Sequence, residues 1–122
     1  MNARSSLLFA ALLAVAGTPA LAAFESIKIP SDNELPRFPI TLIADGITAG
    51  QVVVAVSVNP EGKLDDLLVL GYSHERLASE VTATLKEWRF IPARLDGQAV
   101  GARTELHIDF TVQGAVVTSN IT

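Results

Sequence analysis

The segment Trp88–Ala93, which reads Trp-Arg-Phe-Ile-Pro-Ala, separates a stretch with helical periodicity from one with strand periodicity. Four large apolar residues before and at its start recur at i, i+4, i+8 and i+11, the spacing of one helix face: Leu77, Val81, Leu85 and Trp88. They predict a helix over residues 75–88. Pro92 disfavours helical geometry at the residue before it, so the helix must end ahead of it. Trp88 and Phe90 are therefore expected to be buried anchors, in preference to ligand-binding residues.

The stretch after this segment alternates like a strand that is covered on one face. Its first set of alternate positions is mainly apolar: Ala102, Thr104, Leu106, Ile108, Phe110 and Val112. The positions between them are polar or charged: Arg103, Glu105, His107, Asp109 and Thr111. Since neighbouring side chains of a strand point to opposite faces, one face is predicted to lie on the core and the other in water.

Two further strands are expected before the helix. Gln51–Val58 is dominated by β-branched residues that share one face, which predicts a strand. Asn59–Gly62 has the residue types of a tight turn, because Pro presets φ and Gly accepts the left-handed conformation. Leu64–Leu70 is expected to be the partner strand of this hairpin. Ser73 is the expected N-cap of the helix.

Together these elements predict an α+β fold with two layers. An antiparallel sheet of three strands, with Ala115–Val117 as a candidate fourth, carries one helix on one face. A brief helical segment is expected between Phe38 and Asp45, ending at Gly46. The chain is accordingly divided into residues 1–22, an extended lead-in over 23–36, one domain over 37–117 and a frayed tail over 118–122.

Residues 1–22 have the pattern of a secretory signal peptide. Arg4 supplies a positive start, Leu7–Ala16 is an uncharged apolar run, and Ala20-Leu21-Ala22 is a small-x-small cleavage site. The mature chain is expected to begin near Ala23, in the periplasm of a Gram-negative bacterium. An uncleaved inner-membrane anchor is the alternative, but the apolar run is shorter than a spanning helix requires.

Charge and cysteine content exclude several classes of protein. Removing Arg4 leaves 8 basic and 13 acidic residues, a net charge of −5, without any Lys/Arg cluster. Such a chain has no electrostatic footprint for nucleic acid. The absence of Cys excludes disulfides, Cys-based metal sites and a lipid-anchored lipoprotein.

The sequence shows no catalytic pattern. His74 and His107 lie far apart on different elements and are interpreted as surface residues without a metal. Asp65 and Asp66 are adjacent in a strand, so their side chains are expected to diverge into solvent rather than to form a carboxylate pair. No cofactor or small-molecule substrate is indicated, and an enzyme is the least favoured class.

Several of these motifs together resemble the TonB C-terminal domain family. The likeness covers about Arg37 to Val112 and rests on a Pro-containing pair, a Val-rich hairpin, the Trp-Arg-Phe-Ile-Pro-Ala block and a following Asp-Gly. Its positions in this chain are Phe38, Pro39, Gly62, Leu77, Trp88, Phe90, Pro92 and Gly97. The chain departs from the family where Tyr72-Ser73-His74 replaces a Ser-Ser-Gly turn. That family implies the α+β fold already predicted.

The resemblance also leads us to expect a difference between this chain and part of the family. Energy-transducing members of the family carry an uncleaved membrane helix and a long Pro-rich linker. Here about 14 residues separate the signal region from Phe38, which span roughly 50 Å when fully extended. We therefore do not expect direct energy transduction.

The function that the resemblance implies is protein recognition. Members of this family offer the final strand as an open sheet edge to an extended peptide of an outer-membrane transporter. The implied partner-binding residues here are those on the polar side of that strand: Arg103, Glu105, His107, Asp109 and Thr111. Two alternatives stay open: a transport component with a retained membrane anchor, and a structural domain that forms a homodimer through its edge strand.

Overall fold

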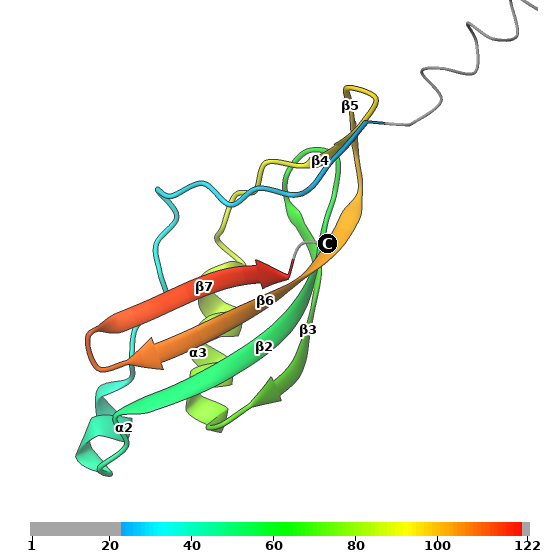
Figure 1. The fold of residues 1–122 in the computed structure, drawn as a ribbon. Helices are drawn as coiled ribbons and strands as arrows, with labels where there is room; N and C mark the ends of the chain where they lie inside the picture. The colour runs from blue at the N-terminus through cyan, green and yellow to red at the C-terminus, as the bar shows by residue number, and fades with distance from the viewer. Residues whose placement is uncertain (1–22, 121–122) are drawn as a thin grey trace, which may run out of the picture.

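The main sheet of the protein has four antiparallel strands in the order β3-β2-β6-β7 (Figure 1). The structure is a computed structural model and describes residues 23–120. The elements of this sheet and its helices are, in chain order, α2 (Ile40–Ala44), β2 (Ala49–Val58), β3 (Leu64–Tyr72), α3 (Glu75–Leu85), β6 (Ala102–Thr111) and β7 (Gly114–Asn120). A second, small sheet has the order β1-β4-β5, with β1 (Phe24–Glu25), β4 (Ala93–Leu95) and β5 (Gln98–Val100).

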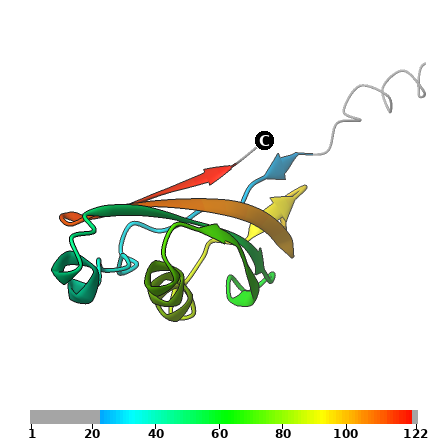
Figure 2. The same ribbon diagram turned by 90° about the horizontal axis from the view of Figure 1, so that it is seen from below.

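The two layers predicted from the sequence are confirmed. Both helices lie on the same face of the main sheet, and the opposite face carries no helix (Figure 2). The candidate fourth strand forms as β7, which pairs with β6 from Glu105↔Asn120 to Thr111↔Gly114. The strand therefore includes residues 118–120, which were expected to belong to the tail. The small sheet was not predicted from the sequence.

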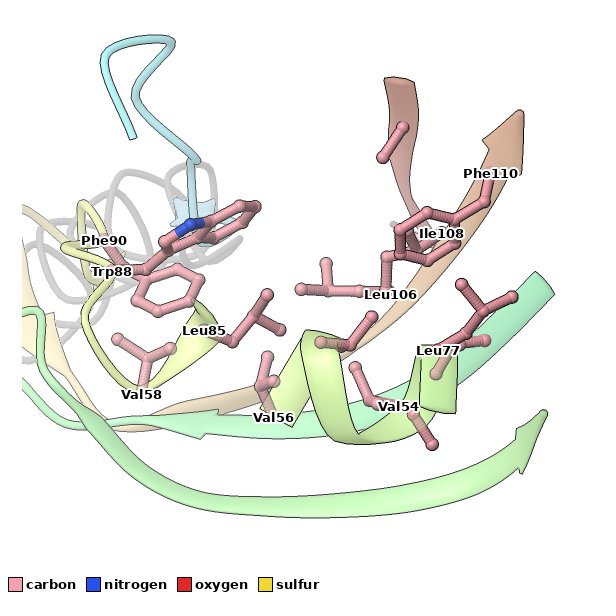
Figure 3. Close-up of a cluster of buried hydrophobic side chains, with 14 of the residues drawn as sticks. Val54, Val56, Val58, Leu77, Leu85, Trp88, Phe90, Leu106, Ile108 and Phe110 are labelled. Carbon is pink, nitrogen blue, oxygen red and sulfur yellow. The ribbon is translucent and has the colours of Figure 1, made fainter. Parts of the chain in front are cut away.

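The core lies between the main sheet and α3 (Figure 3). Alternate side chains of β2 and β6 form the sheet side of the core, and the apolar face of α3 packs on these side chains, as the periodicities of the sequence predict. Trp88 and Phe90 close one end, with ring centroids 5.9 Å apart at a tilt of 54°. The buried residues that form this contact layer include Val52, Val54, Val56, Val58, Leu77, Val81, Leu85, Leu106, Ile108 and Phe110.

Helix α3 ends earlier than predicted. It stops at Leu85, and the N–H of Trp88 then donates to the carbonyl of Leu85 in a tight turn. This turn keeps Trp88 in line with the apolar face of the helix, at 5% exposure, although it lies beyond the helix. The helix thus ends ahead of Pro92, as expected, but six residues (86–91) separate its last residue, Leu85, from that proline.

The prediction of Ser73 as N-cap is wrong. His74 occupies the N-cap position and makes no side-chain capping bond. The Ser73 hydroxyl instead accepts a hydrogen bond from the Gln51 N–H at 2.9 Å, which ties the end of β3 to β2. The competing partner on the neighbouring strand explains why a local capping rule fails here.

The lead-in is fastened to the Trp88–Ala93 segment along its length. Lys28 and Ile91 exchange two backbone hydrogen bonds, at 3.0 and 2.9 Å. The Asn33 side chain pairs with both backbone groups of Arg89, at 2.8 and 3.1 Å. The Trp88 indole N–H donates to the carbonyl of Glu34 at 2.7 Å. The predicted anchor thus holds the lead-in as well as the helix.

The expected signal peptide, residues 1–22, lies outside the described residues. Within residues 23–120, neither helix is long and apolar enough to cross a membrane.

The close approach of the β2–β3 hairpin to Phe90 can be tested by substitution at Gly62. Gly62 has φ +83° as predicted, and a Cβ there would collide with the carbonyl oxygen of Phe90. We expect Gly62→Ala to lower the free energy of unfolding by about 3–4 kcal/mol, from backbone strain plus the collision. Urea denaturation measures this change.

Gly46→Ala is the matched control, because Gly46 also has a positive φ but a Cβ added there would meet no atom within 4 Å. We expect Gly46→Ala to lower the free energy of unfolding by about 1–2 kcal/mol, from backbone strain alone. Equal losses in the two variants would contradict the close approach of the hairpin to Phe90.

Candidate partner-binding edge

Strand β6 is not the open edge that was expected. It lies between β2 and β7, and Glu105, His107, Asp109 and Thr111 are each paired with a residue of β7. Arg103 is paired with Ser57 of β2 and lies beyond the last pair with β7. The expectation failed because Gly114 was interpreted as an interruption of the strand, whereas it follows a two-residue turn that folds the chain back. The edge strands of the main sheet are β7 and β3.

The backbone direction of β7 follows from the register of the whole sheet. The Gln51 carbonyl accepts a hydrogen bond from the Ser73 N–H, on the β3 side of β2. Because the backbone groups of successive strand residues point to opposite sides, the even-numbered residues of β2 direct their N–H and C=O groups towards β6. The registers Val52↔Ile108 and Asp109↔Val116 carry this alternation across the sheet without a shift. The residues of β7 whose N–H and C=O groups point away from β6 are therefore Ala115, Val117 and Ser119.

The edge of β7 is regular and uncharged. Its seven residues, Gly-Ala-Val-Val-Thr-Ser-Asn, pair with β6 without a bulge. Among residues 23–120, no backbone hydrogen bond outside the ladders involves β7. An uninterrupted row of free main-chain groups is what an added strand requires.

The edge of β3 differs in the features that oppose strand addition. Its register with β2 shifts at two places, which leaves Asp65 and Leu70 without a direct partner. Asp65 and Asp66 are both exposed on this edge. Bulges and charges are devices by which proteins protect edge strands. The two edges of the sheet are therefore not equivalent, and β7 is the less protected.

The polar side chains of β6 gather on the face of the sheet without helices. His107 Nε2 lies 3.0 Å from Glu105 Oε1, and both side chains are partly exposed. Val116 of β7, which is 63% exposed, is paired with Asp109 and shares its face. The five predicted residues thus form a row on β6 rather than an edge strand. Four of them lie beside β7, and Arg103 lies beyond its last pair.

The two histidines lie apart and do not form one site. His74 Nδ1 lies 3.0 Å from the neighbouring Ser73 hydroxyl, whereas His107 is in another strand of the sheet. No group of three potential metal ligands and no buried polar or charged residue is found in residues 23–120.

Comparison with known proteins agrees with this architecture. The family described as "Gram-negative bacterial TonB protein C-terminal" matches residues 34–112. The solution NMR structure of the Pseudomonas aeruginosa TonB C-terminal domain is similar, with a TM-score of 0.59 and 27% sequence identity. The match covers 73% of this chain and 89% of that one. No protein of curated function matches.

The domain is thus an α+β module of the TonB C-terminal type. Since the family match spans more than half of the chain, this protein belongs to the TonB C-terminal family. The residues that carried the resemblance are structural: Phe38 lies against Phe110 with ring centroids 6.3 Å apart, and Pro39 precedes α2. Gly62 and Gly97 have positive φ, and Leu77, Trp88 and Phe90 are buried.

The sequence carried a signal for β7 that the alternation of β6 obscured. Gly114 follows Val112 and Gln113, the two turn residues, and has φ +151°. The residues behind it, Ala115 to Thr118, are small or β-branched. A short gap of three residues that contains a Gly, here 112–114, between two such runs is a hairpin signal.

Amide hydrogen exchange tests the assigned direction of β7. We expect the Val117 amide to exchange faster than those of Val116 and Thr118, since only the latter two donate into the β6 ladder. NMR-detected exchange of the free protein measures this difference. Protection of Val117 equal to that of its neighbours would show that the outer edge of β7 is already occupied.

Proposed function

We propose that this protein is an exported, periplasmic protein-binding module that takes up an extended partner segment by β-strand addition. The regular, uncharged outer edge of β7 is the observation that carries this proposal. A partner strand would pair with the free main-chain groups of Ala115, Val117 and Ser119, so that binding depends little on side-chain identity. Family membership supports a protein partner of the kind that TonB domains meet.

The partner we propose is a periplasm-facing segment of an outer-membrane transporter. The similar solved structure is that of a TonB C-terminal domain, and transporter recognition is the property that the family resemblance implies. The helix-free face beside β7 adds partly exposed groups, Val116 from β7 and the polar row on β6, that a partner side chain can contact. These β6 residues become direct strand neighbours of the partner only if β7 leaves the sheet.

A proline substitution at Val117 tests main-chain pairing at this edge. Val117→Pro removes an outward N–H and leaves the N–H groups that bond to β6 intact, a position that edge strands tolerate. With a panel of peptides from transporters of the same bacterium, we expect the best binder to lose about ten-fold in affinity, the equivalent of one or two main-chain hydrogen bonds. Fluorescence anisotropy measures the change.

Val117→Ala is the control, because it removes the side chain of this partly buried residue and keeps the N–H. The affinity of Val117→Ala for the peptide should remain within about two-fold of that of the original protein. If proline and alanine have equal effects, main-chain pairing at β7 is not the mode of binding.

A cross-strand disulfide distinguishes addition to β7 from replacement of β7. Asp109 and Val116 are paired and lie on the helix-free face, and the sequence has no Cys to interfere. Facing residues of a hydrogen-bonded pair lie about 5.5 Å apart, within disulfide range. We expect the Asp109→Cys/Val116→Cys protein to bind the peptide equally when oxidised and when reduced.

Loss of binding in the oxidised form alone would contradict addition at β7. It would instead mean that the partner displaces β7 and pairs with β6, beside Glu105, His107 and Thr111, as the family resemblance implied.

The competing proposal is a homodimer in which the outer edge of β7 pairs with β7 of a second copy. A second copy of β7 meets no charge repulsion there, because the strand is uncharged. Sedimentation equilibrium over a hundred-fold concentration range separates the two proposals. A mass that stays monomeric excludes the dimer and leaves the partner-binding edge free.

A further inference from the structure

The small sheet holds the residue at which the mature chain is expected to start. Ala23 directly precedes β1 and lies opposite Asp96, the next pair beyond Phe24↔Leu95. The Ala23 backbone N donates to Asp96 Oδ1 at 3.0 Å, and the Asp96 N–H donates to the Ala23 carbonyl at 2.8 Å. A side-chain carboxylate thus takes the place of a backbone acceptor at the end of this ladder.

From this contact we infer that Asp96 is a binding site for the α-ammonium group that signal-peptide cleavage creates at Ala23. The inference rests on the export that is part of the proposed function, and it goes beyond that function. After cleavage behind Ala22, the nitrogen that Asp96 already binds gains protons and a positive charge. The amide hydrogen bond then becomes a charge-assisted pair between ammonium and carboxylate.

The charges around Asp96 leave its carboxylate available. Arg94, the nearest cation along the chain, donates to the Gly97 carbonyl at 2.9 Å and is paired in register with Glu25. Lys28 Nζ lies 3.9 Å from Glu25. No ion pair involving Asp96 is found within residues 23–120. The α-ammonium group is the cation that the geometry offers to this carboxylate.

Turn formation alone does not require the carboxylate. Asp96 and Gly97 have φ values of +53° and +83°, as expected of a two-residue turn between β4 and β5. Asn-Gly forms such turns equally well, and an Asn side chain keeps an oxygen at the Oδ1 position. Asp96→Asn therefore removes the charge while it preserves the turn and the acceptor.

The pair would fasten β1, which has only two residues, to the rest of the domain. Chain ends are poorly ordered unless they are tied down. Here the tie gains its charge only when the chain has been cut at the correct bond, because an uncut chain offers Asp96 a neutral amide hydrogen bond. Cleavage would therefore strengthen the attachment of β1 to β4 in the exported protein.

The test uses the full chain, expressed and processed in cells, with and without Asp96→Asn. Intact mass and N-terminal sequencing of the purified proteins first locate the mature end, which we expect at Ala23 in both. The rate at which an acetyl succinimidyl ester modifies the Ala23 amine at neutral pH is then followed by mass spectrometry. Lys63 and Lys86, both exposed, serve as internal references in the same sample.

We expect the Ala23 amine to react about 1.5- to 5-fold more slowly in the original protein than in Asp96→Asn, the range of an exposed ion pair. The reason is that an ammonium group held by a carboxylate is not nucleophilic. The difference should vanish in urea, and the two lysines should react alike in both proteins.

Equal rates for the folded proteins, or a mature N-terminus at another residue, would overturn the inference. A chain that keeps residues 1–22 would overturn the proposed cleavage as well and would favour the retained membrane anchor. Equal rates with a chain that starts at Ala23 would remove only the role of Asp96. The peptide-binding edge of β7 is measured separately and would stand in that case.

Discussion

Burial of the valine-rich strand β2 is the interaction around which this domain is built. Val52, Val54, Val56 and Val58 are almost fully buried beneath α3 and the Trp88–Phe90 pair. Since β2 pairs with β3 on one side and β6 on the other, the same strand fixes the register of the whole main sheet. The Trp-Arg-Phe-Ile-Pro-Ala segment covers one end of these valines and also holds the lead-in through Glu34 and Arg89.

This central strand leaves two edges with opposite properties. On one side, β3 bulges twice against β2 and carries adjacent carboxylates. On the other side, β6 and then β7 continue the sheet without a shift in register. Because bulges and charges discourage edge pairing, the physical asymmetry of the sheet directs strand addition to β7. Membership of the TonB C-terminal family is consistent with a role in protein recognition.

Local sequence patterns predicted most of the fold and less of the candidate site. The alternation of Leu106, Ile108 and Phe110 and the helical spacing of Leu77 and Val81 report directly which face is buried, so the layers followed from them. Strand neighbours depend on long-range pairing instead. The position of β6 inside the sheet depends on the hairpin at Gly114, and the pairing of Ser73 with Gln51 overrides its capping preference. The assignment of side chains to the two faces was therefore correct within β6. Val112, expected on the core face, instead lies in the turn after β6 and is 47% exposed, and the identity of the edge strand was wrong.

The most direct measurement of the central claim is photo-crosslinking in living cells from the two edges of the sheet. A photoreactive amino acid replaces Thr118 on β7 in one protein and Leu68 on β3 in another, both exposed positions. We expect a crosslink to an outer-membrane transporter from position 118 and none from position 68. A transporter crosslink from position 68 alone would contradict it, because the partner would then bind at the protected edge.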